Sequence, residues 1–126
     1  MKLVLDAGAF VAVERRDRVV EALVKAELVA GRTLVTHGGV IGQVWRGGAG
    51  KQARLALLMS AVEIAPLDEH LGRRAGMLLK QTRTTDVIDA AVVLLAEDGD
   101  IILTSDPADL EPLARAAGVH VDIVGL

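Results

Sequence analysis

Short apolar strand patterns alternate with helical patterns along the whole sequence, and this alternation limits the possible folds more than any other feature. Runs rich in Val, Leu and Ile recur at Lys2–Leu5, Thr33–Thr36, Val62–Ala65, Ile101–Thr104 and Val119–Val124. Repeated strand and helix units of this kind form parallel sheets that are covered by helices. We therefore predict an α/β fold, a three-layer α/β/α sandwich around a central, mostly parallel, five-stranded sheet.

The segments between these strands carry the periodicity of helices. Helical patterns occupy Arg18–Ala30, Val40–Arg46, Lys51–Ser60, Leu71–Lys80 and Pro107–Ala117. The segment Asp86–Ala96 differs, because after its two aspartates every residue is Ala, Val, Ile or Leu. A helix without a polar face is stable only inside a protein, so we expect this helix to be buried.

Length and composition exclude several classes of protein. The 126 residues suit one domain, and we expect residues 1–126 to form it. There is no cysteine, which excludes a disulfide framework, a thiolate nucleophile and a cysteine zinc site. The apolar run after Lys2 is too short for a signal peptide, and no run approaches the ~20 residues of a membrane helix, so we expect a cytoplasmic protein.

Aspartates follow two of the predicted strands at the point where each strand ends. Asp6 follows KLVL, and Asp106 follows IILTS. Ligands of open parallel sheets bind at the carboxyl ends of the strands, so these carboxylates face one crevice if the two strands are neighbours. Asp86 and Asp89 are three residues apart and share one face at the start of the apolar helix. The sequence thus offers four aspartates to one site.

A cluster of four carboxylates favours a particular chemistry. The groups repel one another, and near a protein interior they either take up protons or bind a cation. Hard oxygen ligands favour Mg²⁺ or Mn²⁺. Such a cation can activate water and neutralise the charge that develops on a phosphodiester. The formal net charge of -3 argues against nucleic-acid binding. If the four aspartates surround a cation, however, the rest of the chain has a slightly positive formal charge. Hydrolysis of a nucleic-acid backbone therefore stays compatible with the composition.

Most of these aspartates also have a structural interpretation. Asp106 precedes a proline and has the pattern of a helix N-cap, and Asp6 and Asp86 could cap the helices that follow them. Asp89 lies within the first turn of an otherwise apolar helix, where capping does not explain it. Both interpretations are open for the first three residues.

Other polar residues give weaker signals. His37, His70 and His120 show no ligand spacing, and we expect them on the surface or in loops. The basic residues are most simply solvated helix faces. Among them, Arg46, which lies beside Trp45 and a glycine pair, is the residue to test as a phosphate contact, although a structural role is the favoured interpretation for it too.

The order of these motifs resembles the PIN domain, and in particular the VapC-like ribonuclease toxins of type II toxin–antitoxin systems. The resemblance covers the whole chain and is carried by VLDAGAF at Asp6, DVIDAAVVLLA at Asp86 and Asp89, and ILTSDPADL at Asp106. It implies an Mg²⁺-dependent endoribonuclease acting on structured RNA, often tRNA. Asp6, Asp89 and Asp106 match the metal-binding acids, and Asp86 resembles an additional acid found in part of the family. The catalytic set implied is therefore Asp6, Asp86, Asp89 and Asp106.

The resemblance also implies partners. Such proteins are commonly homodimers, and a cognate antitoxin protein silences them by placing its C-terminal segment near the metal. No membrane association is implied.

One position departs from the family pattern. The family usually has a glutamate on the helix after the second strand, where THGGVIGQVWRGG has Gln43. An amide brings no negative charge, so metal affinity should fall. The alternative function is therefore a catalytically weakened PIN-like module that binds RNA or a protein. A receiver-like domain with an acidic phosphoryl-transfer pocket is a third interpretation, but no lysine stands in the expected place after the late strands.

Overall fold

A five-stranded parallel sheet forms the centre of the molecule. The computed structural model describes residues 1–48 and 50–126. The strands are β1 (Lys2–Leu5), β2 (Thr33–His37), β3 (Glu63–Ala65), β4 (Ile101–Thr104) and β5 (Asp122–Gly125). They pair in the order β3-β2-β1-β4-β5, and every pair is parallel. The predicted sheet is thus confirmed, and in the described residues it is wholly rather than mostly parallel.

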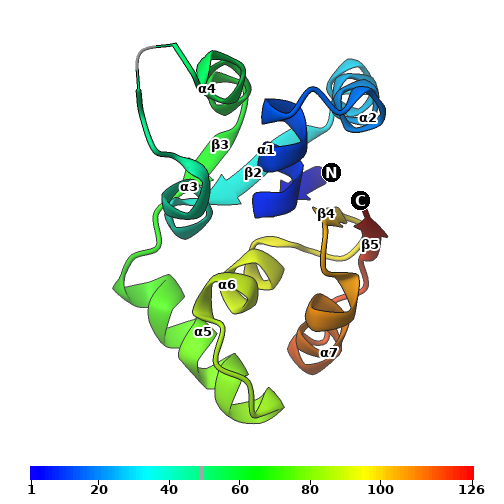
Figure 1. The fold of residues 1–126 in the computed structure, drawn as a ribbon. Coiled ribbons are helices and arrows are strands. Elements are labelled where there is room, and N and C mark those ends of the chain that lie inside the picture. Colours follow the sequence, from blue (N-terminus) through cyan, green and yellow to red (C-terminus); the bar gives the residue numbers. More distant parts are fainter. Residues whose placement is uncertain (49) are drawn as a thin grey trace.

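Seven helices in the described residues cover the two faces of the sheet. They are α1 (Ala7–Glu14), α2 (Arg18–Val29), α3 (Gly38–Val44), α4 (Ala53–Ser60), α5 (Glu69–Thr82), α6 (Val87–Leu95) and α7 (Pro107–Ala117). Helix α1 packs against α2, α3 and α4, whereas α6 packs against α5 and α7. In Figure 1, α2 and α4 lie in the upper part of the view, and α5, α6 and α7 lie in the lower part. The predicted three-layer sandwich is confirmed.

The core is aliphatic, as the composition requires. Its residues come from all three layers, and Phe10, the single phenylalanine, is fully buried among them. The middle of α6, from Ala90 to Val93, is also fully buried. This helix contacts β1 and β2 as well as α5 and α7, so its apolar sequence meets protein on several sides. The prediction that this helix is buried is confirmed for its middle, while Val87 at its start is exposed.

The last strand starts later than the sequence pattern predicts. The pattern begins at Val119, but the ladder with β4 begins at Asp122. The backbone of Val119 instead donates to the carbonyl of Ala114 at the end of α7, and that of His120 donates to the carboxylate of Asp98. These residues close the turn after α7, so they cannot pair with β4. None of the helices in the described part of the chain is long and apolar enough to cross a membrane.

Candidate active site

The sheet order places a crevice at the carboxyl end of β1. The chain runs outward from β1 through β2 to β3, and then crosses to β4 on the other side of β1. Ligands of open α/β sheets bind at such a switch point, because connections leave the two neighbouring strands in opposite directions. Leu5 pairs with Leu103, and the backbone of Asp6 donates to the carbonyl of Leu103 over 3.1 Å. The expectation that the strands before Asp6 and Asp106 are neighbours is therefore confirmed.

A threonine at the end of β4 fixes the carboxylate of Asp6. The Oδ1 atom of Asp6 accepts from the backbone N–H of Ala7 at 2.8 Å, and its Oδ2 atom accepts from the Oγ1 of Thr104 at 2.8 Å. The same Oγ1 accepts from the backbone N–H of Asp106 at 3.0 Å. Both side chains are buried. Sequence reasoning missed Thr104, and the available signal was a polar residue ending an apolar strand two positions before an aspartate.

The capping interpretation is right for Asp86 and Asp6 and wrong for the Asp106 side chain. The Oδ1 atom of Asp86 accepts from the backbone N–H groups of Ile88 and Asp89, both at 3.0 Å. Asp6 caps α1 through Ala7. Asp106 holds the N-cap position of α7 but makes no capping hydrogen bond, because its backbone has turned to donate to Thr104. Its carboxylate therefore stays free of the helix end.

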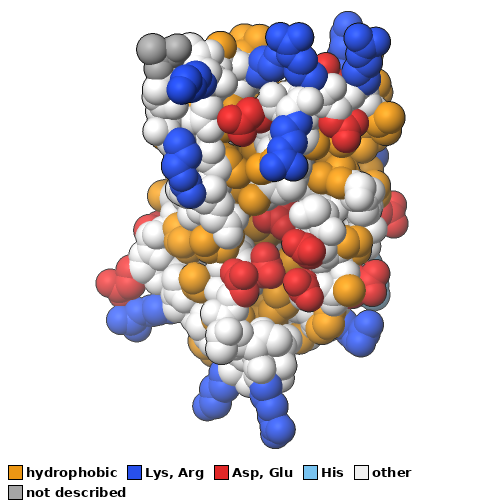
Figure 2. Space-filling view, in the orientation of Figure 1, with side chains coloured by type: hydrophobic (Ala, Val, Ile, Leu, Met, Phe, Trp, Pro, Cys, Tyr) orange, Lys and Arg blue, Asp and Glu red, His pale blue; other side chains and the backbone are white. Residues whose placement is uncertain are grey.

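Asp89 is the electrostatic centre of the site. It is half-buried in the first turn of α6. The pKa of Asp89 is raised from 3.8 to about 7, first by burial and then by the carboxylates of Asp86, Asp6, Asp109 and Asp106, in that order. The other three predicted aspartates thus act on Asp89 through space. Asp109, in the first turn of α7, was missed as a member of this cluster. Figure 2 shows Asp and Glu side chains gathered in the middle of this face.

The donor set is compatible with a hydrated Mg²⁺ ion. Within residues 1–48 and 50–126, no three His, Asp or Glu side chains lie close enough together to hold a metal ion between them. Mg²⁺ commonly binds one or two carboxylates directly and keeps several waters, so a three-carboxylate cage is not required. Each oxygen of Asp6 accepts one hydrogen bond and keeps a lone pair, and the raised pKa of Asp89 reflects its burial and, after that, the negative charge around it. Asp6 and Asp89 are therefore the residues that fit direct ligation, with Asp106 beside them.

His37 is buried at the end of β2, which corrects the expectation of a surface or loop histidine. Its Nδ1 atom accepts from the backbone N–H of Gly39 at 3.0 Å, so Nε2 carries the proton that it donates to the carbonyl of Ile88 at 3.0 Å. Burial lowers the pKa of His37. The neutral ring joins the start of α3 to the first turn of α6, next to Asp89. A histidine directly after a strand and before two glycines was the sequence signal for this role.

The two candidates on and after α3 have different surroundings. Gln43 is exposed, so its amide is accessible from solvent. The Nη1 atom of Arg46 donates to the carbonyls of Gly42 and Trp45, at 3.0 and 2.7 Å, which uses the guanidinium to close the end of α3. This geometry favours a structural role for Arg46 over the predicted phosphate contact.

A buried glutamine holds the loop that follows α3. The Oε1 atom of Gln52 accepts from the backbone N–H groups of Arg46 and Gly47, and its Nε2 atom donates to Glu14 and to the carbonyl of Val44. The amide is thus fully satisfied and fixes the loop against the end of α1.

Two hollows flank the acidic cluster. The first has a volume of about 410 Å³ and is lined by the segment between α5 and α6 and by parts of α6 and α7, including Asp86, Asp89 and Asp109. The second has a volume of about 430 Å³ and is lined by α1 and by Ser105, which follows β4. The acidic cluster therefore has a hollow on each side of it.

Comparison with solved structures shows a similar fold. The structure of VapBC2 from Rickettsia felis, bound to a DNA fragment from their promoter, is similar to this chain with a TM-score of 0.70. The two are 12% identical, and the similarity covers 98% of this chain and 99% of that chain. No family model matches the sequence. No curated protein matches it either. The likeness establishes a shared fold over essentially the whole chain.

Proposed function

We propose that this protein is an Mg²⁺-dependent endoribonuclease that hydrolyses RNA phosphodiester bonds, and that it is the toxin of a toxin–antitoxin pair. One observation carries the proposal: at the β1–β4 switch point Asp6, Asp86 and Asp106 surround the half-buried Asp89, whose pKa is raised to about 7 by burial and then by these neighbouring charges. The shared fold with VapBC2 supports the same assignment.

Each aspartate has its own role in the proposal. Asp6 and Asp89 hold Mg²⁺, or Mn²⁺ in its place, and Asp106 completes the ligand set directly or through water. When bound, the cation activates a water molecule and neutralises charge on the scissile phosphate. Asp86 keeps the first turn of α6 in place through its two cap hydrogen bonds and adds negative charge. Thr104 holds the carboxylate of Asp6 in one orientation.

The proposal extends to partners. The similar structure is of VapBC2 with promoter DNA. By analogy, we propose a cognate antitoxin protein as the partner of this chain, a homodimer as its assembly, and RNA, with tRNA among the candidates, as its substrate. The cytoplasm, where such RNA is found, is the proposed location.

The direct test is Mg²⁺ binding by calorimetry followed by an RNA cleavage assay on the same samples. We expect Asp6→Asn and Asp89→Asn to lose both metal binding and cleavage, with activity falling at least about 100-fold, since each removes a ligand. Asp122→Asn is the matched control. Asp122 is exposed at the start of β5, beside the amino end of β4, whereas the acidic cluster lies beyond the carboxyl ends of β1 and β4. Normal cleavage by Asp6→Asn or Asp89→Asn protein would refute the assignment.

Substitution of Gln43 tests whether the protein cuts RNA or only binds it. The alternative function is a PIN-like module that holds RNA or a protein without cutting, and the uncharged, exposed amide of Gln43 favours it. If the unmodified protein takes up no metal while Gln43→Glu protein binds Mg²⁺ and cuts RNA, the missing charge is the cause. If Gln43→Glu changes neither property, another feature silences the site.

A further inference from the structure

The second hollow has the composition of a nucleotide subsite. Ala7 and Ser105, which lie on its wall, are the direct neighbours of Asp6 and Asp106. The hollow therefore lies next to Asp6 and Asp106, and its lining includes neither Asp86 nor Asp89. Its volume of about 430 Å³ lies within the usual range of small-molecule sites.

The floor of this hollow has no room for a side chain. A Cβ atom at Gly8 would lie 2.8 Å from the Cβ of Ser105 and 3.0 Å from its backbone nitrogen. Gly8 therefore lets α1 approach Ser105 in the loop after β4, and both residues line the hollow. Val11, Ala12 and Leu126 form apolar walls. Apolar walls suit the face of a ribose or a base.

Arg15 supplies positive charge to the same hollow. It is exposed at the C-cap of α1, and it is the basic residue among the described residues on this lining. Within the described part of the chain, its guanidinium makes no hydrogen bond or ion pair with another residue. Asp17 on the same wall is occupied as the N-cap of α2, where it accepts from Val19 and Val20.

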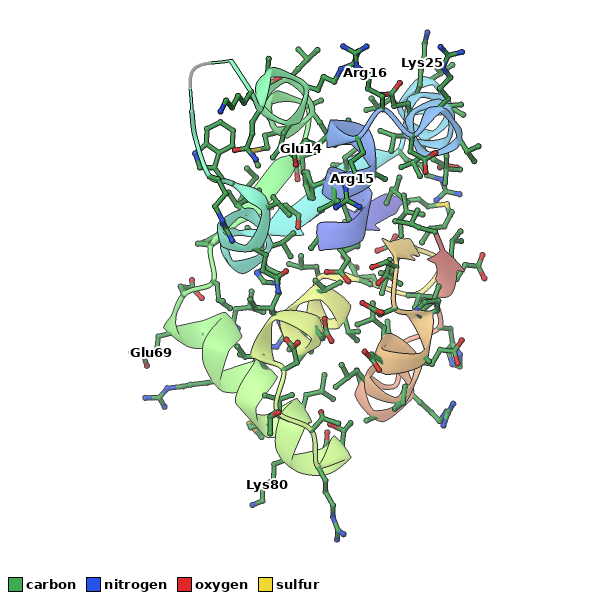
Figure 3. The ribbon with its side chains drawn as sticks, viewed as in Figure 1. Glu14, Arg15, Arg16, Lys25, Glu69 and Lys80 are labelled. Carbon is green, nitrogen blue, oxygen red and sulfur yellow. The ribbon has the colours of Figure 1, made fainter. Side chains whose placement is uncertain are left out.

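The surface charge continues this pattern. Figure 2 shows Lys and Arg side chains across the upper part of the face, above the central group of acids. In Figure 3, Arg15 lies in front of α1, between these two regions, whereas Arg16 points toward the top of the view. Because Arg15 lines the same hollow as Ala7 and Ser105, its guanidinium is available to a phosphate of a strand that continues from the acidic cluster into the hollow.

We propose that Arg15 binds a backbone phosphate of the RNA strand adjacent to the scissile phosphate, and that the hollow lined by Ala7, Gly8 and Ser105 receives the attached nucleoside. This inference rests on the proposed function. It adds a substrate contact that none of the acidic motifs contains.

The test measures binding of a short, fluorescein-labelled, mixed-sequence single-stranded RNA by anisotropy. It uses Asp89→Asn protein, which does not cut, over a series of salt concentrations. Arg15→Gln should weaken binding by on the order of tenfold and lower the slope of log affinity against log salt by about 0.7, because one phosphate contact is lost. Arg15→Lys should keep the slope, since it keeps the charge.

Arg73→Gln is the matched control. It removes the same charge from α5, where Arg73 is exposed, pairs with Glu69 and lines neither hollow. Equal effects of Arg15→Gln and Arg73→Gln on affinity and slope would overturn the inference while leaving the ribonuclease assignment intact. If the unmodified protein neither binds nor cuts RNA, both proposals are overturned. Binding that depends on Arg15, in a protein that never cuts, would support the subsite and refute the nuclease.

Discussion

Asp89→Asn should make the metal-free protein more stable at alkaline pH while abolishing metal binding. The pKa of Asp89 is about 7 in the folded protein and 3.8 for an ordinary aspartate. Between these values the folded state holds a proton that the unfolded state has released. Stability therefore falls as the pH rises through this window, and the full cost of the charged carboxylate is present above about pH 7. An amide at this position carries no such cost.

The expected magnitude follows from the size of the pKa difference. At about 1.36 kcal/mol for each pH unit, the difference corresponds to about 4 kcal/mol for a fully buried group. Asp89 is only half-buried, and solvent screening reduces this to about 1 to 2 kcal/mol. The charge also interacts favourably with the start of α6, by about 0.3 to 1 kcal/mol, and the amide loses that contribution. We expect a net gain of about 1 kcal/mol at alkaline pH.

Urea unfolding in the presence of a chelator measures this gain. The free energy of unfolding of the unmodified and Asp89→Asn proteins should be compared at about pH 8, and at about pH 5, where roughly a third of the cost has developed. Asp122→Asn, far from the cluster, should show no such pH dependence. Saturating Mg²⁺ should reverse the order, since an excess of about 100 times the Kd stabilises the unmodified protein by about 2.7 kcal/mol. An Asp89→Asn protein that is no more stable at either pH would refute the electrostatic argument.

Four further measurements test other parts of the structure. Mg²⁺ affinity should fall about tenfold for each pH unit below about 7, because the ion must displace the proton of Asp89, and calorimetry at several pH values checks this. Thr104→Val should lower the free energy of unfolding by about 1 to 3 kcal/mol, since the buried carboxylate of Asp6 loses a donor; an unchanged urea midpoint would contradict the contact. Gln52→Leu removes all four of its amide hydrogen bonds and should cost about 2 to 4 kcal/mol, seen as a lower thermal midpoint. His37→Gln can still donate to the carbonyl of Ile88 in α6, whereas His37→Asn can only accept from Gly39 at the start of α3. His37→Gln should therefore retain more Mg²⁺ affinity than His37→Asn. The reverse order would show that the Ile88 contact does not position Asp89.

Local sequence patterns predicted most of the secondary structure. The first and fourth strands have the predicted bounds, and the buried helix was evident because it lacks a polar face. Helix α1 was anticipated only as a short helix that Asp6 could cap, since AGAFVAVE follows β1 directly and has little polar periodicity. The cap at Asp86 could also be anticipated, because an N-cap interacts with residues two and three positions further along the chain.

The relation between the aspartates could not be obtained from local patterns. Asp106 precedes Pro107 like an N-cap, yet its backbone turns toward Thr104, and its carboxylate leaves the helix end. Asp109 joins the cluster only because α7 packs beside α6. Sequence spacing along one helix does not contain either fact, since each depends on a second element.

What the sequence determined by itself is the set of elements and the edge of the sheet at which the acids collect. Period-two and helical patterns act over a few residues, and the carboxyl ends of parallel strands meet at one edge. What only the tertiary structure decided is the environment of each side chain. The burial of His37, the hydrogen bond from Thr104 to Asp6, and the high pKa of Asp89 arise because strands and helices distant in sequence become neighbours. Desolvation and charge interactions act through space, and their strength depends on distances that the chain order does not specify.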